Sequence, residues 1–99
     1  MSKEEEIYKY SNPDKVKEIA DNEFGKDNYE LLLSTRKNKK YMIRGEFTDN
    51  KWVHFGQMGY EDYTKHNDKR RRNLFRKRNY KWYYMDKDTP AFISTLLLW

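Results

Sequence analysis

The first pattern along the chain is a set of apolar residues that recur three and four positions apart within residues 11–25. This spacing predicts a helix with one apolar stripe, formed by Val16, Ile19, Ala20 and Phe24. Ser11 or Asn12 can cap the start of the helix, and Pro13 suits its first turn. Gly25 is a suitable residue just beyond its end.

The pattern then changes to short apolar segments separated by polar turns. The segments NYELLLST, KYMIRGEF and KWVHFG lie within residues 28–56, with RKNK and TDN between them. In the second segment, Tyr41 and Ile43 alternate with Met42 and Arg44, which places the two pairs on opposite faces of a strand. Residues 28–56 therefore predict a three-stranded antiparallel β-meander.

A second helix, strongly basic, is expected over residues 64–79. Gly56 and Gly59 precede it in a loop that can turn away from the sheet, and Asp62 or Thr64 can cap it. Its only large apolar side chains are Leu74 and Phe75. We expect these two side chains to anchor the helix to the sheet, which leaves most of its circumference basic.

The last segment, residues 89–99, predicts a C-terminal apolar helix that begins at Thr89 and Pro90. Its apolar side chains either complete the core or form an interface with another protein. We expect residues 1–10, which are highly charged, to be flexible. The whole chain, 1–99, predicts a single α+β domain with an N-terminal helix, a three-stranded antiparallel β-meander, a basic helix and a C-terminal apolar helix.

Composition supports a folded chain with an uneven charge. Charged residues make up 37% of the sequence, a share that favours disorder. Aromatic residues make up 17%, however, and disordered chains are poor in aromatic residues. Residues 1–35 carry a net charge of −4, and residues 36–99 carry +9. The basic part predicts a polyanionic partner. There is no cysteine, and we expect neither a secretory signal nor a membrane span.

The strongest functional signal is the stretch KRRRNLFRKRNYKW, residues 69–82, which holds eight lysines and arginines and no acidic residue. Such side chains can displace the counterions of a nucleic acid backbone. The alternative is a solvated charged surface with no partner. The candidate nucleic-acid-binding residues come from this stretch and from the tip of the first hairpin: Lys69, Arg70, Arg71, Arg72, Arg76, Lys77, Arg78, Lys81, Arg36, Lys37, Lys39 and Lys40.

Four aromatic residues follow the basic helix: Tyr80, Trp82, Tyr83 and Tyr84. They can stack on unpaired bases, as in proteins that bind single strands. In a domain this small, however, rings are also needed to cover the core, and we favour the structural role for all four.

Catalytic and metal-binding chemistry have weaker signals. His54 and His66 are the only histidines, and their spacing to nearby acids matches no standard zinc site. A nuclease-like site would need Asp62 or His66, but capping explains the acids of this segment equally well. We expect no enzyme activity, no metal and no cofactor.

The segments VHFGQMGYEDYTKHNDKRRRNLFRKR and TPAFISTLLLW resemble a family of small basic proteins of uncharacterised function from nucleocytoplasmic large DNA viruses, the giant viruses among them. The similarity covers His54–Gly56, the loop from Gly59 to Thr64, the pair His66 and Asp68, and the closing Leu97–Trp99. It implies a viral origin and a place in the virion or in the cytoplasm or nucleus of the infected host cell.

Together these features predict a protein that binds double-stranded DNA without sequence specificity, for packaging or condensation of a viral genome. A homodimer formed through the C-terminal apolar segment would place two basic surfaces on one particle. The alternative is a structural virion protein, such as a minor capsid or scaffold component, whose basic surface binds an acidic protein.

Overall fold

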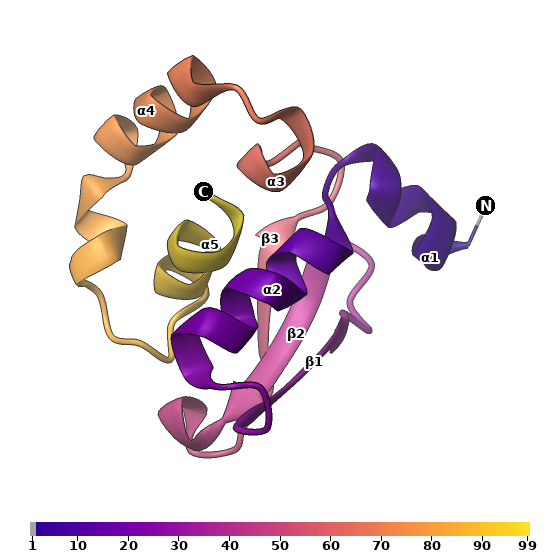
Figure 1. Ribbon diagram of the computed structural model, residues 1–99, viewed down its shortest axis with the longest axis vertical. Helices are drawn as coiled ribbons and strands as arrows, with labels where there is room; N and C mark the ends of the chain where they lie inside the picture. The colour runs from indigo at the N-terminus through magenta and orange to yellow at the C-terminus, as the bar shows by residue number, and fades with distance from the viewer. Residues whose placement is uncertain (1) are drawn as a thin grey trace.

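Three antiparallel strands form the sheet on which the main helices pack (Figure 1). The computed structural model describes residues 2–99. The strands β1 (Tyr29–Leu33), β2 (Lys39–Gly45) and β3 (Val53–Gln57) lie in the order β1-β2-β3. Leu31 is opposite Ile43, and Tyr41 is opposite Phe55. The predicted β-meander is confirmed.

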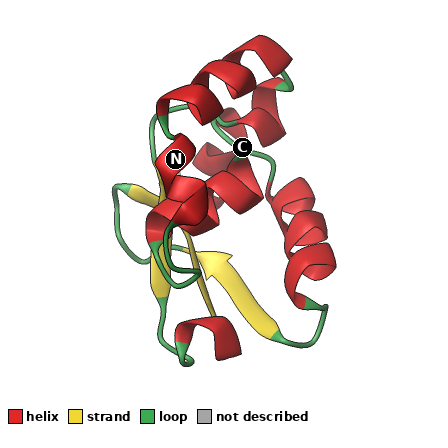
Figure 2. Cartoon of the chain, turned by 90° about the vertical axis from the view of Figure 1, so that its left-hand side faces the viewer, coloured by secondary structure: helices red, strands yellow, loops and turns green. Residues whose placement is uncertain are grey.

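The helices lie mainly on one face of this sheet, with α2 and α5 covering it (Figure 2). The predicted α+β class, with an N-terminal and a C-terminal helix, is therefore confirmed. Within the described residues, no helix is long and apolar enough to cross a membrane. The helical elements are α1 (Lys3–Glu6), η1 (Ile7–Lys9), α2 (Pro13–Phe24), η2 (Glu46–Thr48), α3 (Tyr63–His66), α4 (Lys69–Arg78), η3 (Tyr80–Tyr84) and α5 (Pro90–Leu98).

The first ten residues are more ordered than their charge predicted. Lys3–Glu6 and Ile7–Lys9 are helical, and the side chain of Ile7 is buried. The Lys3 ammonium group donates hydrogen bonds to the backbone carbonyl oxygens of Ser34, at 2.6 Å, and Arg36, at 2.7 Å. The expectation of a flexible segment is corrected for residues 2–10, while Met1 lies outside the described residues.

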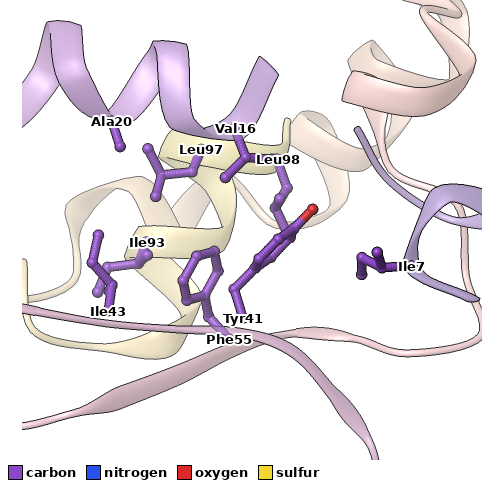
Figure 3. Packing of buried hydrophobic residues seen from close by; sticks show 9 residues of the cluster. All are labelled: Ile7, Val16, Ala20, Tyr41, Ile43, Phe55, Ile93, Leu97 and Leu98. Carbon is purple, nitrogen blue, oxygen red and sulfur yellow. The ribbon is translucent and has the colours of Figure 1, made fainter. Parts of the chain in front are cut away.

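The hydrophobic core lies between the sheet and helices α2 and α5 (Figure 3). The strands contribute Tyr41, Ile43 and Phe55, whose side chains point toward α5 and α2. Helix α2 begins at the predicted cap, where the Asn12 side chain accepts a hydrogen bond from the amide of Lys15. The other buried apolar residues are Ile7, Val16, Ala20, Ile93, Leu97 and Leu98.

The C-terminal helix completes this core. Thr89 caps α5 by accepting a hydrogen bond from the amide of Phe92, and Ile93, Leu97 and Leu98 are buried beneath it. Of the two roles predicted for this segment, the structure shows the one in the core. These buried side chains are not available for the predicted homodimer contact.

The predicted single helix over residues 64–79 is in fact two helices, so that expectation was wrong. Asp62 caps α3, which ends at Asn67, and Asp68 caps α4. Asn67 has a φ of 54°, a left-handed conformation that asparagine tolerates better than most residues and that cannot continue a right-handed helix. The break changes the direction of the chain, and α4 lies at the upper left of the molecule in Figure 1.

Candidate nucleic-acid interface

The outer face of α4 carries a group of cations that the helical repeat places together. Residues four apart lie next to each other on a helix surface, so Lys69, Asn73 and Lys77 form one row along α4, and Arg70, Leu74 and Arg78 form the adjacent row. The two rows together make one face of the helix. Within residues 2–99, none of the four cations on this face takes part in an ion pair. We call this set the outer face of α4, and its exposed cations are Lys69, Arg70, Lys77 and Arg78.

The inner face of α4 packs on the C-terminal residue. The ring of Phe75 stacks on the ring of Trp99, with centroids 4.1 Å apart and an interplanar angle of 4°, and Trp82 meets Phe75 edge-on at 5.8 Å. Leu74 instead points outward and is 52% exposed. The expectation that Leu74 and Phe75 both anchor the helix to the sheet is therefore corrected: Phe75 alone anchors it, and its partners are tryptophans.

Two of the predicted arginines of α4 already have partners. The Arg72 Nε donates a hydrogen bond to the backbone oxygen of Trp99, and its guanidinium lies 4.5 Å from the centre of the Tyr63 ring. Arg71 pairs with Glu61 at 3.3 Å, in a surface pair that water screens. These contacts set Arg71 and Arg72 apart from the four free cations of the outer face.

Arg76 and Lys81 lie at the borders of the outer face. Arg76 is exposed and turned toward α5, where its burial, followed by the positive charge of Arg72, lowers the pKa of the guanidinium. Lys81 is exposed in η3, directly after α4. Both can add positive potential to one edge of the helix.

The tip of the first hairpin is separate from α4. Figure 1 shows the β1–β2 turn on the right, beside α1, and α4 at the upper left. Arg36 and Lys37 are exposed on this turn, and Lys39 is half-buried. The acidic helix α1 lies next to them, so any contribution of this tip to phosphate contact would come from a surface apart from α4.

Lys40 is a clear correction, because it is buried and cannot contact phosphate. Its side chain is 3% exposed, and its ammonium group lies 3.0 Å from a carboxylate oxygen of Asp62, which is also buried. It also donates to the backbone oxygen of Tyr10 at 3.3 Å. Burial lowers the pKa of Lys40, and the negative charge of Asp62 opposes that shift.

A buried hydrogen-bond network continues from this ion pair. Asp62 accepts hydrogen bonds from the amide and hydroxyl of Thr64, and the Thr64 hydroxyl lies 3.2 Å from that of Ser11. The Tyr41 hydroxyl donates to Ser11 at 2.7 Å. The loop GYEDYT therefore joins the start of α3 to β2 and to the N-terminal segment.

The structure also explains why position 56, in the same region, is a glycine. Its φ is 80°, and a Cβ atom at this position would lie 2.9 Å from a methyl group of Leu98. A larger residue would be strained by the backbone, and the side chains of Leu98 and Lys40 would have to shift. The segment His54–Gly56 thus lies in the part of β3 that α5 approaches closely.

The tyrosines after α4 are more exposed than predicted. Tyr80, Tyr83 and Tyr84 are 59%, 54% and 83% exposed, and Trp82 alone packs inward on Phe75. The structural role that the sequence favoured is confirmed for Trp82 and for Tyr83, whose ring lies 6.0 Å from that of Phe92 in α5, and is wrong for Tyr80 and Tyr84. They place aromatic rings beside the basic helix, where a base could stack on them.

The histidines and acids do not converge on one site. His54 Nδ1 lies 2.6 Å from the Ser34 hydroxyl, and His66 Nδ1 accepts a hydrogen bond from the amide of Asp68. Asp68 in turn caps α4, and Asp62 is paired with Lys40. Among residues 2–99, no group of three or more His, Cys, Asp or Glu side chains is arranged to hold a metal ion.

A cavity of about 320 Å³ lies between α2, α4 and α5, and no pattern in the sequence predicted it. Its lining includes Arg72, Arg76 and Tyr83 together with Leu96 and Trp99. The sequence does hold one signal of it, since Arg72 and Arg76 are four residues apart and so share a helix face. The other walls come from distant segments, whose approach the sequence does not reveal.

Comparison with known proteins gives one relationship. A search of curated proteins found no match, and a search of solved structures found none either. A family of unknown function (DUF5754) matches residues 29–79, from the start of β1 to the residue after α4. The match includes the meander, the buried pair Lys40–Asp62 and the whole basic helix. Because it spans more than half of the chain, the protein belongs to this family of unknown function.

Proposed function

We propose that the protein binds double-stranded DNA without sequence specificity, through the outer face of α4. The observation that carries this proposal is the group of four exposed cations that pair with no carboxylate within residues 2–99. They are attached to a helix that Asp68 caps and that Phe75 fixes on Trp99. Because the backbone of this helix is already ordered, contact with phosphates has to order only the four side chains, which favours binding.

The size of the outer face sets the expected strength of binding. A ten-residue helix is about 15 Å long, so it reaches a few phosphates of a duplex. If its four cations each neutralise one phosphate, the logarithm of the affinity falls with the logarithm of salt concentration with a slope of about −4. Asn73 is the one uncharged polar side chain on this face, so we expect only slight sequence preference.

We place this activity in the packaging or condensation of a viral genome, in the virion or the infected cell. The setting follows from the resemblance to proteins of large DNA viruses. A protein of this kind should co-purify with virion cores and not only with infected-cell extracts, which mass spectrometry of purified virions would test.

The second candidate is a structural virion protein whose basic surface binds an acidic protein. Leu74 favours it, because this apolar side chain is half-exposed in the middle of the four cations. Apolar contact at the centre of a surface with charges around it is typical of protein interfaces. A bare phosphate backbone offers Leu74 no comparable contact.

The test is fluorescence anisotropy with a short duplex of random sequence and, separately, with polyglutamate. We expect the double variant Arg70→Glu and Lys77→Glu to abolish duplex binding. The matched control reverses the two exposed charges of the hairpin tip, Arg36→Glu and Lys37→Glu, and should bind nearly as the unmodified protein does. Tight binding to polyglutamate with no binding to the duplex would favour the acidic protein instead.

A further inference from the structure

The cavity between α2, α4 and α5 combines positive charge with apolar and aromatic walls. Its volume of about 320 Å³ is at the lower end of the range for small-ligand sites. Tyr63, Tyr83 and Trp99 contribute rings, and Leu96 contributes an aliphatic surface. Arg72 and Arg76 contribute the charge. Such walls suit a ligand with a flat apolar part and an anionic part.

The two guanidinium groups share one side of the cavity. Arg72 is held there by its hydrogen bond to the backbone oxygen of Trp99 and by the ring of Tyr63. That bond uses one of the five N–H donors of the guanidinium. Arg76 follows one turn later, and its pKa is lowered partly by the charge of Arg72.

Within residues 2–99, no Asp or Glu side chain forms an ion pair with Arg72 or Arg76. Glu23 and Lys15 also line the cavity. An anion between the two guanidiniums would relieve their mutual repulsion and accept forked hydrogen bonds from them.

The aromatic walls indicate what the anion is attached to. Tyr83 lines the cavity and is 54% exposed, although its ring also lies 6.0 Å from that of Phe92, so part of its surface is open to a ligand. Tyr80 and Tyr84 are exposed beside it in η3. Successive exposed rings next to cations are typical of surfaces that hold unpaired bases.

We propose that this cavity binds one unpaired nucleotide, with its phosphate at Arg72 and Arg76 and its base against Tyr83 and Leu96. This inference rests on the proposed binding of DNA and adds a preference to it. A duplex with a frayed or single-stranded end binds better than a blunt duplex of equal charge, because its terminal nucleotide enters the cavity while α4 contacts the backbone.

The probes are dAMP, inorganic phosphate and deoxyadenosine, each titrated by calorimetry into the full chain. We expect dAMP to bind. Inorganic phosphate and deoxyadenosine should each bind at least about tenfold more weakly than dAMP, because each makes only part of the contacts. Tyr83→Ala should weaken the binding of dAMP and leave that of phosphate unchanged.

A matched pair of variants distinguishes binding of dAMP in the cavity from a general attraction of the anion to positive charge. Arg76→Ala should weaken dAMP about tenfold, the usual loss for one charge-assisted hydrogen bond. Arg78→Ala removes the same charge from the outer face of the same helix and should leave dAMP binding unchanged. Urea unfolding of both variants checks that the fold is retained.

Three results would overturn the cavity proposal: no dAMP binding by the unmodified chain, equal binding of dAMP and phosphate, or equal losses in Arg76→Ala and Arg78→Ala. Equal binding would mean a simple anion site. The double variant Arg70→Glu and Lys77→Glu changes the outer face of α4 and leaves the cavity intact. Its effect on duplex binding therefore tests the duplex proposal independently of the dAMP titrations.

Discussion

Lys40 and Lys77 both come from basic stretches of the sequence, yet they belong to opposite kinds of site. Lys40 is buried, and Asp62 lies 3.0 Å from its ammonium group. Lys77 is exposed on the outer face of α4, among three other cations that have no carboxylate partner in the described residues. A buried charge needs its internal partner, whereas an exposed one is free for an external partner. The same residue type is therefore structural in one place and available for binding in the other.

The largest expected effect comes from breaking the buried pair. Asp62→Ala leaves the Lys40 charge without its partner and also removes the cap of α3, so we expect a loss of roughly 3–5 kcal/mol in the free energy of unfolding. Urea denaturation followed by circular dichroism measures it. Glu61→Ala, which removes the exposed partner of Arg71, should cost less than about 1 kcal/mol. If the two losses were equal, Lys40 would be reaching water and the contrast with Lys77 would fail.

The next effect concerns binding and should leave stability intact. Between 50 and 200 mM salt, the affinity of the unmodified protein for duplex DNA should fall roughly 100-fold, as four phosphate contacts require. Replacing Lys69, Arg70, Lys77 and Arg78 with alanine should nearly remove this dependence. The free energy of unfolding should stay the same or rise, because alanine favours helices and the like charges are gone. A quadruple variant that retained the full salt dependence would place the contacts elsewhere.

A third variant tests whether α4 must be fixed in place. Phe75→Ala removes the stack on Trp99 and should cost about 2 kcal/mol, less than a fully buried phenylalanine because Phe75 is half-buried. Leu74→Ala, its exposed neighbour, should change stability by less than about 0.5 kcal/mol. Thermal unfolding of both variants makes the comparison. Similar losses in the two would mean that Leu74 also anchors the helix.

The smallest expected effect is a pH dependence at His54. Burial, followed by nearby cations of which Arg36 is the foremost, lowers the pKa of His54. Below the usual histidine pKa of about 6.5, the unfolded chain therefore binds the proton more readily than the folded chain. The free energy of unfolding should fall as the pH drops from 7 toward the lowered pKa.

The matched variant for this effect is His54→Gln, which should show a smaller decrease in stability over the same pH range. His66, whose pKa is also lowered by burial, keeps its own contribution in both proteins. A variant with the same slope as the unmodified protein would contradict the assignment to His54.

Local patterns in the sequence predicted the elements well and their tertiary roles less well. Asn12, Pro13 and Gly25 mark α2 because caps and turn residues act on their immediate neighbours. Asn67 and Asp68 are local signals of the same kind, a left-handed C-cap and an N-cap, and the prediction of one helix over residues 64–79 overlooked them. The burial of Lys40 depends on Asp62, which is 22 residues away, and no local pattern shows that two such residues meet.

The candidate interface was likewise only partly visible in the sequence. The eight cations of residues 69–82 stand out, but helical geometry and long-range contacts decide which of them face water. Arg72 lies on the inner side of α4 because Trp99 and Tyr63, from elsewhere in the chain, contact its guanidinium there. The hairpin tip is apart from α4 because the order of the strands places its turn next to α1.

The most direct test of the central claim is an NMR titration of the isotopically labelled chain with a short duplex of random sequence. We expect the largest changes in chemical shift at the backbone amides of Lys69, Arg70, Lys77 and Arg78, with smaller ones in η3 and none at Lys40. Changes confined to the β1–β2 turn, or an unchanged spectrum at low salt, would contradict the assignment of DNA binding to the outer face of α4.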